Sequence, residues 1–96
     1  MKIAVIGTGI SGMTTAYLLS PEHEITVYEA NDYVGGHTRT VDVPVNGRNY
    51  AVDTGFIVFN EKTYTHFIRL MRKLDIGWKD SDMSFSVKCA KNGLEF

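Results

Sequence analysis

The chain begins with a short apolar run that ends in a glycine-rich segment. Lys2-Ile-Ala-Val-Ile6 leads directly into Gly7-Thr-Gly9-Ile-Ser-Gly12. A short apolar run bounded by glycine is typical of a buried strand and the turn that follows it. Apolar residues then recur at helical spacing as far as Pro21, and Glu24-Ile-Thr-Val-Tyr28 is a second apolar run. The pattern predicts a βαβ unit with strands at residues 2–6 and about 23–29.

Two hairpins are predicted further along the chain. The segments Thr38–Val43 and Arg48–Asp53 have the composition of strands, and Pro44-Val-Asn46-Gly47 joins them. Asn-Gly is a strong short-range signal for a hairpin turn. A second hairpin is predicted over residues 85–96, with its turn at Lys91-Asn92-Gly93.

One more helix is predicted between these hairpins, over about residues 61–74. Asn60 is its predicted N-cap, and Gly77 is the predicted stop. Its apolar positions are Tyr64, Phe67, Ile68, Met71 and Leu74. Because they fall on one face of a helix, we expect them to form core.

The composition excludes several classes of protein. The 96 residues suit one small domain, and ten basic against eleven acidic residues give a net charge of −1, so we expect no nucleic-acid partner. No apolar run approaches the roughly 20 residues of a membrane span, and we expect no secretory signal, because the first apolar run ends in a glycine turn. The single cysteine, Cys89, excludes an internal disulfide and fits a reducing compartment, which predicts a cytoplasmic location. No residues have the spacing of metal ligands, so no metal is expected.

The glycine segment has the residue types that a phosphate-binding turn needs. Gly7 can adopt the backbone angles of the turn, Gly9 lets a pyrophosphate approach the main chain, and Gly12 lets the helix pack on the strand. The amides at the start of that helix, including those of Ile10 and Ser11, would face the phosphates. The alternative is a tight turn whose glycines serve packing alone.

Glu29 closes the second predicted strand, about 20 residues after the glycine turn, the separation expected for a carboxylate that accepts from ribose hydroxyls. Together with the turn, it predicts an α/β, Rossmann-like dinucleotide-binding fold. This unit alone does not separate FAD from NAD, because both ligands use it.

The segment from Glu29 to Arg39, with its Gly35-Gly36-His37-Thr38 sequence, resembles the flavin-containing amine oxidase superfamily. That family includes monoamine oxidase, protoporphyrinogen oxidase and phytoene desaturase. More narrowly, the chain resembles a bacterial branch of predicted NAD/FAD-binding, amine-oxidase-like proteins. The resemblance implies that Gly35, Gly36 and Thr38 line the diphosphate side of FAD and that Ala30 lies near the ribose or adenine.

Val52-Asp-Thr-Gly-Phe56 resembles the family segment that passes beneath the flavin. Thr54, Gly55 and Phe56 are therefore candidates for contact with the isoalloxazine end. The chain departs from the family at His37, where many relatives have arginine, and at Asn31, where many have a basic residue. Both changes remove fixed positive charge near a diphosphate, and His37 stays a candidate beside the cofactor because imidazole can donate to phosphate.

The resemblance implies an N-terminal fragment of a longer FAD-dependent oxidoreductase of the amine oxidase or desaturase type. Residues 1–96 would be its FAD-binding portion, and residues from about 57 would begin a substrate-binding part for a small molecule. We expect this chain alone to be inactive. The first strand would lack a partner on one side, which predicts self-association through that edge. The alternatives are a non-catalytic dinucleotide-binding module and a fragment of an NAD-dependent dehydrogenase.

Overall fold

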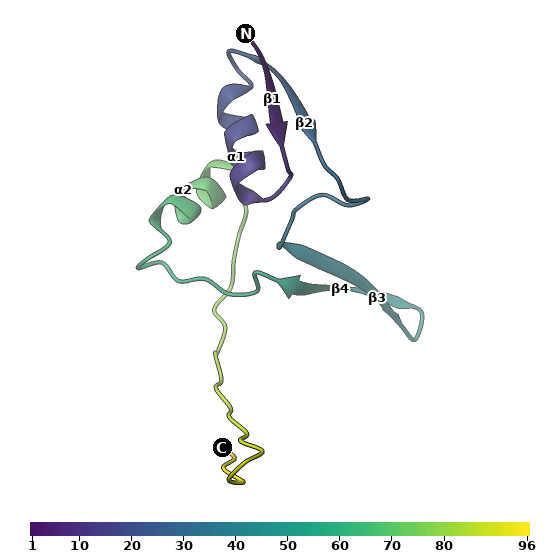
Figure 1. Cartoon of the computed structure of the whole chain (residues 1–96), viewed down its shortest axis with the longest axis vertical. Coiled ribbons are helices and arrows are strands. Elements are labelled where there is room, and N and C mark those ends of the chain that lie inside the picture. Colours follow the sequence, from purple (N-terminus) through teal and green to yellow (C-terminus); the bar gives the residue numbers. More distant parts are fainter. The chain divides into compact units, whose positions relative to one another are not determined.

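Two parallel strands joined by a helix form the start of the chain (Figure 1). The computed structural model describes residues 1–96, which divide into two compact units, unit 1 (Met1–Ile57) and unit 2 (Val58–Phe96). In unit 1, β1 (Lys2–Ile6) pairs in parallel with β2 (Glu24–Tyr28), and α1 (Ile10–Leu19) connects them. The predicted βαβ unit is confirmed, with β2 one residue shorter at each end.

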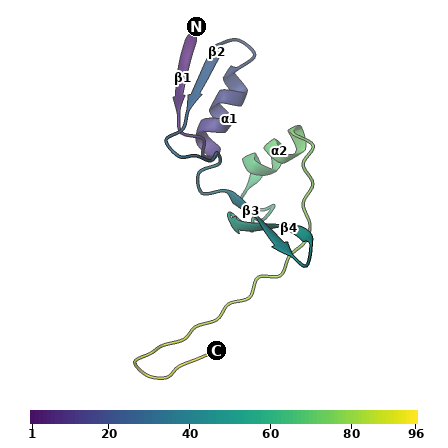
Figure 2. The ribbon, with the colours of Figure 1, turned by 90° about the vertical axis from the view of Figure 1, so that its right-hand side faces the viewer.

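The core of unit 1 lies between α1 and one face of this sheet (Figure 2). Successive strand residues alternate between the two faces. The more buried face carries Ile3, Val5, Ile25 and Val27, which are level in the parallel register. Val5 and Ala16 are the buried apolar residues of unit 1. Removing their side chains from water stabilises the packing of α1 on the sheet.

The other edge of β1 pairs with no strand of this chain, because the sheet has only the two strands β1 and β2. The open edge that the sequence predicts is therefore present. Ile6, at the end of β1, is 79% exposed. Self-association through this edge stays a prediction.

The first hairpin consists of β3 (Arg39–Val45) and β4 (Arg48–Gly55), which pair antiparallel. Its existence is confirmed, but the predicted four-residue connection is wrong, because Pro44 pairs with Asn49 inside the ladder. The turn needs only Asn46 and Gly47, whose φ angles of 50° and 77° suit a two-residue hairpin turn. Proline is tolerated there because neither strand of a two-stranded ribbon has a second neighbour to hydrogen-bond.

In unit 2, α2 (Thr65–Lys73) begins later than predicted. Asn60 Oδ1 accepts hydrogen bonds from the Thr63 N–H (2.8 Å) and the Thr63 hydroxyl (2.9 Å). Asn60 therefore closes a separate turn, and the helix follows with Tyr64 as its N-cap. The prediction that Asn60 caps the helix is wrong, because asparagine side chains stabilise such local turns as readily as helix starts.

The α2 helix ends close to Leu74, as predicted, but the chain reverses at Asp75 and not at the predicted stop, Gly77. Asp75 has a φ of 55°. The Ile76 N–H donates to the Met71 carbonyl (2.9 Å), and the Asp75 N–H donates to the Arg72 carbonyl (3.1 Å). This is the hydrogen-bond pattern of a Schellman motif, in which glycine usually occupies the left-handed position.

Aromatic side chains of α2 and its flanks pack together within unit 2. The Phe59 ring lies 5.0 Å from Phe67 and 5.8 Å from Trp78, centroid to centroid, in edge-to-face geometry. Tyr64 makes similar contacts at 6.4 Å with Phe59 and Phe67. Such arrangements suit the charge distribution of aromatic rings. Neither α1 nor α2 has the length and apolar character needed to cross a membrane.

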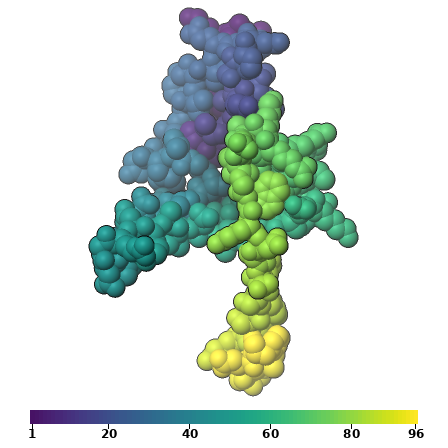
Figure 3. All heavy atoms as spheres, turned by 180° about the vertical axis from the view of Figure 1, so that it is seen from behind, coloured from purple at the N-terminus to yellow at the C-terminus, as the bar shows by residue number.

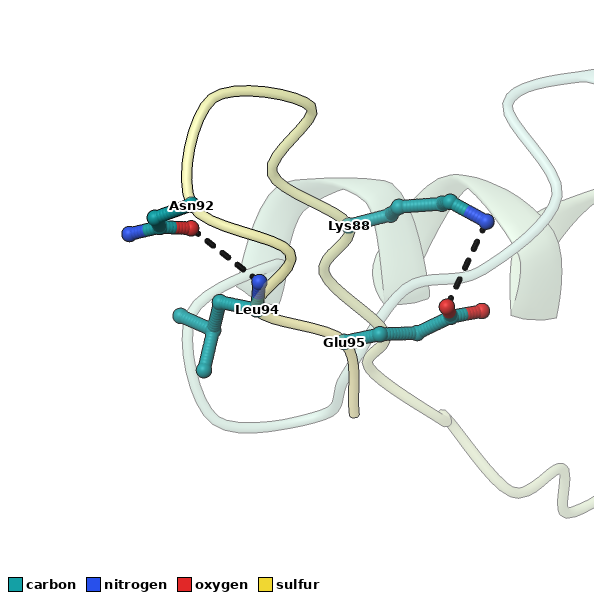
Figure 4. Close-up of polar contacts among 4 residues, drawn as sticks. All are labelled: Lys88, Asn92, Leu94 and Glu95. Atoms are coloured by element: carbon teal, nitrogen blue, oxygen red, sulfur yellow. Dashed lines mark hydrogen bonds and ion pairs between the residues drawn. The ribbon is translucent and has the colours of Figure 1, made fainter.

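The second predicted hairpin is present near the C-terminus, but it is shorter than predicted. Val87 and Phe96 exchange backbone hydrogen bonds of 2.7 and 3.0 Å, and only one bridge pair, Lys88 with Glu95, satisfies ladder geometry. The Lys88 ammonium lies 3.3 Å from the Glu95 carboxylate, and Asn92 Oδ1 accepts from the Leu94 N–H (Figure 4). Residues 76–87 have no regular secondary structure, and Figure 3 shows this stretch narrowing toward the yellow terminal residues.

Candidate functional site

The turn between β1 and α1 requires glycine at two positions, Gly7 and Gly12, for different structural reasons. Gly7 has a φ of 95°, which side chains disfavour. A methyl group at Gly12 would overlap the Gly7 carbonyl oxygen and would lie 3.4 Å from Val5 Cγ1. The first turn of α1 can therefore lie against β1 only because residue 12 has no side chain.

Gly9 differs from both, because the fold does not require glycine at this position. Its φ of −68° and ψ of 177° are open to any residue. A methyl group at Gly9 would meet no other atom of the chain within 4 Å. The packing alternative thus accounts for Gly12 but not for Gly9. Glycine at residue 9 is an acceptable N-cap for α1 and leaves the main chain open to a close approach from outside the chain.

The amides that follow Gly9 have no acceptor within the chain. The first hydrogen bond of α1 is donated by the Met13 N–H to the Gly9 carbonyl (3.0 Å), so the N–H groups of Ile10, Ser11 and Gly12 are unpaired. The first turn of the helix carries no acidic side chain. These N–H groups and the positive end of the helix dipole therefore favour an anion beside Gly9.

Thr8 connects this turn to Glu29 at the end of β2. The Thr8 hydroxyl and the Thr8 N–H (3.1 Å) both donate to Glu29 Oε1. Glu29 Oε2 accepts from the Asn31 N–H (3.1 Å). These hydrogen bonds lower the pKa of the Glu29 carboxyl below its usual range. The Thr8 hydroxyl has the largest effect, followed by the backbone amides of Asn31 and Thr8. Glu29 is consequently an ionised hydrogen-bond acceptor at neutral pH.

The second glycine pair lies directly on the first turn. The Gly35 N–H donates to both the carbonyl and the hydroxyl oxygen of Thr8, each at 3.1 Å. A methyl group at Gly36 would lie only 2.9 Å from Gly9 Cα. The Thr38 hydroxyl and the Thr38 N–H (3.1 Å) donate to the Gly35 carbonyl, which closes this turn. The structure thus brings the two glycine turns and Glu29 together.

The end of β4 lies beside this second turn. A methyl group at Gly55 would overlap the His37 carbonyl oxygen, and Gly55 pairs with Arg39 in the ladder. The register shifts between Arg39 and Thr40, and the Thr54 hydroxyl donates to the Arg39 carbonyl (3.1 Å). Such bulges redirect side chains and are common next to functional sites. Phe56 follows with a φ of 54°, which is unusual for an aromatic residue.

Other predicted residues lie near the turns without a contact that fixes them. Ile10, Ser11, Ala30 and His37 are exposed. The guanidinium of Arg39, which no motif spacing marks as a site residue, lies 4.2 Å from the centre of the Tyr33 ring. This cation–π contact places a fixed positive charge on the segment that carries the second glycine pair.

Thr8 is the other residue that sequence reasoning misses. Its place between two glycines gives no periodic signal, and its partner Glu29 lies 21 residues further on. A buried hydroxyl is recognisable as part of the site only once the fold brings these residues together.

Comparison with known proteins places residues 5–74 in a family described as the NAD(P)-binding Rossmann-like domain. A zeta-carotene desaturase of Capsicum annuum is 36% identical over 75 residues, which cover 77% of this chain and 12% of that protein. An L-amino-acid oxidase of Sistrurus catenatus edwardsii is 42% identical over 40 residues, covering 41% of this chain and 8% of the oxidase. A 4,4'-diapophytoene desaturase of Staphylococcus aureus (strain Newman) is 49% identical over 37 residues, which cover 38% of this chain and 7% of the desaturase.

These matches confirm the resemblance to the flavin-containing amine oxidase superfamily and the predicted Rossmann-like α/β fold. This chain spans only a small part of each relative's length, 12% for the Capsicum annuum desaturase.

Proposed function

The chain belongs to the NAD(P)-binding Rossmann-like domain family, and on that premise we propose that it is the FAD-binding N-terminal portion of a flavin-dependent oxidoreductase of the amine oxidase and desaturase type. The observation that carries the proposal is Gly9, a glycine that neither backbone conformation nor packing requires. The Gly36 backbone lies against it, which supports FAD over NAD. A nicotinamide domain has no need for a second turn at this point.

The proposed site holds the two ends of the ADP moiety separately. The diphosphate would lie on Gly9, bound by the free amides at the start of α1 and flanked by the second glycine turn. The ionised Glu29 would accept from the ribose. The residues proposed on this side are Gly7, Gly9, Ile10, Ser11, Gly12, Glu29, Ala30, Gly35, Gly36 and Thr38.

Thr54, Gly55 and Phe56 are proposed to lie toward the flavin ring, with His37 beside the cofactor. This placement is supported by the contact of Gly55 with the His37 backbone, which links the end of β4 to the second glycine turn. FAD would supply the redox chemistry when bound, and the residues of this chain would bind and orient it.

Unit 2 is proposed to begin the substrate-binding part, from about residue 57. In support, the chain divides after Ile57, and unit 2 has an aromatic cluster of its own. The names of the relatives include carotenoid desaturases and an amino-acid oxidase, so the proposal goes no further than oxidation of a small molecule. A cytoplasmic location belongs to the same proposal.

Replacement of Gly9 by valine tests the site. We expect Gly9→Val to weaken FAD binding by more than about tenfold, because the side chain would occupy the space of the pyrophosphate. The variant should still fold, since the Cβ atom at this position would meet no atom within 4 Å, although a poorer N-cap would cost about 1 kcal/mol. Fluorescence titration of FAD and urea unfolding measure the two effects.

Gly77→Val is the matched control. Gly77 is also open to a side chain and has an ordinary φ, but it lies in unit 2, outside the proposed site. It should therefore leave FAD binding unchanged. A folded Gly9→Val protein that binds FAD as tightly as the wild type would refute the proposed site.

A further inference from the structure

Thr8 is the only polar residue that is buried, with 5% of its surface exposed. Buried polar groups are almost always hydrogen-bonded, and those of Thr8 all point to the site. Its N–H and hydroxyl donate to Glu29 Oε1, and its carbonyl and hydroxyl oxygens accept from the Gly35 N–H. One hydroxyl thus joins the first glycine turn, the carboxylate of β2 and the second glycine turn.

These contacts determine how Glu29 can bind a ligand. A carboxylate has about four acceptor positions. Thr8 provides two donors to Oε1 and Asn31 provides one to Oε2, and the Ala30 N–H makes a weaker contact with the same carboxylate. The flexible glutamate side chain is therefore held in one orientation, which lowers the entropy that binding would otherwise cost.

We propose that Thr8 is a positioning residue for Glu29, whose carboxylate accepts from a ribose hydroxyl of the bound nucleotide. The inference rests on the proposed function and extends it to a residue that does not itself touch the ligand. The Gly35 N–H donates to the Thr8 carbonyl as well as to its hydroxyl. The second glycine turn therefore keeps a backbone contact with residue 8 when the hydroxyl is removed, and the loss acts on Glu29.

Thr8→Val isolates the hydroxyl, because valine keeps the branched shape and both backbone contacts of residue 8. We expect ADP to bind Thr8→Val roughly tenfold more weakly, the fold-change for loss of about one hydrogen bond to a charged group. The same substitution should change the affinity for 2′,3′-dideoxy-ADP by less than about twofold, because that ligand has no ribose hydroxyls. Thr8→Ser should restore ADP binding.

The control is Thr40→Val, which removes another threonine hydroxyl of unit 1, one that donates to Asp53 (2.7 Å) in the hairpin. It should leave the affinity for both ligands unchanged. In a Glu29→Ala background, Thr8→Val should have no further effect on ADP binding. Equal losses for ADP and the dideoxy ligand, or additive losses in the double variant, would show a purely structural role and overturn the inference.

A measurement without nucleotide separates this inference from the proposed function. Carboxyl NMR titration should show the Glu29 pKa rising in Thr8→Val and returning in Thr8→Ser, because the hydroxyl is the main group that lowers it. An unchanged Glu29 pKa would overturn the inference whatever the binding data. A raised pKa, with no ADP binding by the wild type, would support the hold of Thr8 on Glu29 and refute the proposed function.

Discussion

Gly12 and Gly9 lie three residues apart in one turn, yet they are glycines for different physical reasons. At Gly12 a methyl group would overlap the Gly7 carbonyl oxygen, so helix packing excludes any side chain. At Gly9 a methyl group would meet nothing within 4 Å. Substitutions at the two positions should therefore separate stability from binding.

Gly12→Ala should destabilise the chain by about 1–3 kcal/mol, because α1 must shift away from β1 to admit the methyl group. Urea unfolding followed by circular dichroism measures the change. Gly77→Ala, at an open position with ordinary φ, should stay within about 0.5 kcal/mol of the wild type. If Gly12→Ala were as stable as Gly77→Ala, the close packing of α1 on the turn would be wrong.

At the residue scale, the sequence predicts what depends on spacing. The glycine turn and Glu29 follow from a known separation along the chain. The roles of Thr8 and Arg39 do not, because each depends on a partner that only the folded turns bring near. A threonine between two glycines has the same local pattern whether its hydroxyl is buried or exposed.

At the scale of elements, type is predicted better than boundaries. The hydrophobic pattern gives the type of β1, α1, β2 and α2 correctly. Burial follows the pattern only in part, because Leu18 of α1 and Leu74, the C-cap of α2, are exposed. The ends depend on local hydrogen bonds that compete. Asn60 Oδ1 accepts hydrogen bonds in a separate turn and not at the helix start, and the helix is stopped by Asp75, in a left-handed conformation, and not by Gly77.

The positive φ of Asp75 leads to a prediction about the end of α2. Asp75→Gly should stabilise the helix end by up to about 1 kcal/mol, because glycine adopts a positive φ without steric cost. Slower hydrogen exchange of the Ile76 N–H, which donates to Met71, measures this directly.

Asp75→Asn controls for charge, since it removes the carboxylate from the negative end of the helix dipole and keeps a side chain. The gain in Asp75→Gly should exceed that in Asp75→Asn. Faster exchange in Asp75→Gly would contradict a Schellman end at this residue.

At the scale of the whole molecule, every proposed cofactor-binding residue lies in unit 1. The two glycine turns, Glu29 and the end of β4 all fall within Met1–Ile57. The family follows from residues 5–74, whereas substrate and activity belong to proteins of which this chain covers a small part. Cofactor binding is thus the property that can be measured on this chain alone.

The most direct measurement is a calorimetric titration of the chain with FAD, and with NAD and ADP in parallel. Saturable binding that is strongest for FAD is the predicted result, because the proposed site continues from the two glycine turns to the end of β4, toward the proposed position of the flavin ring. Equal affinity for the three ligands, or no binding by a chain shown to be folded, would contradict assignment as an FAD-binding domain.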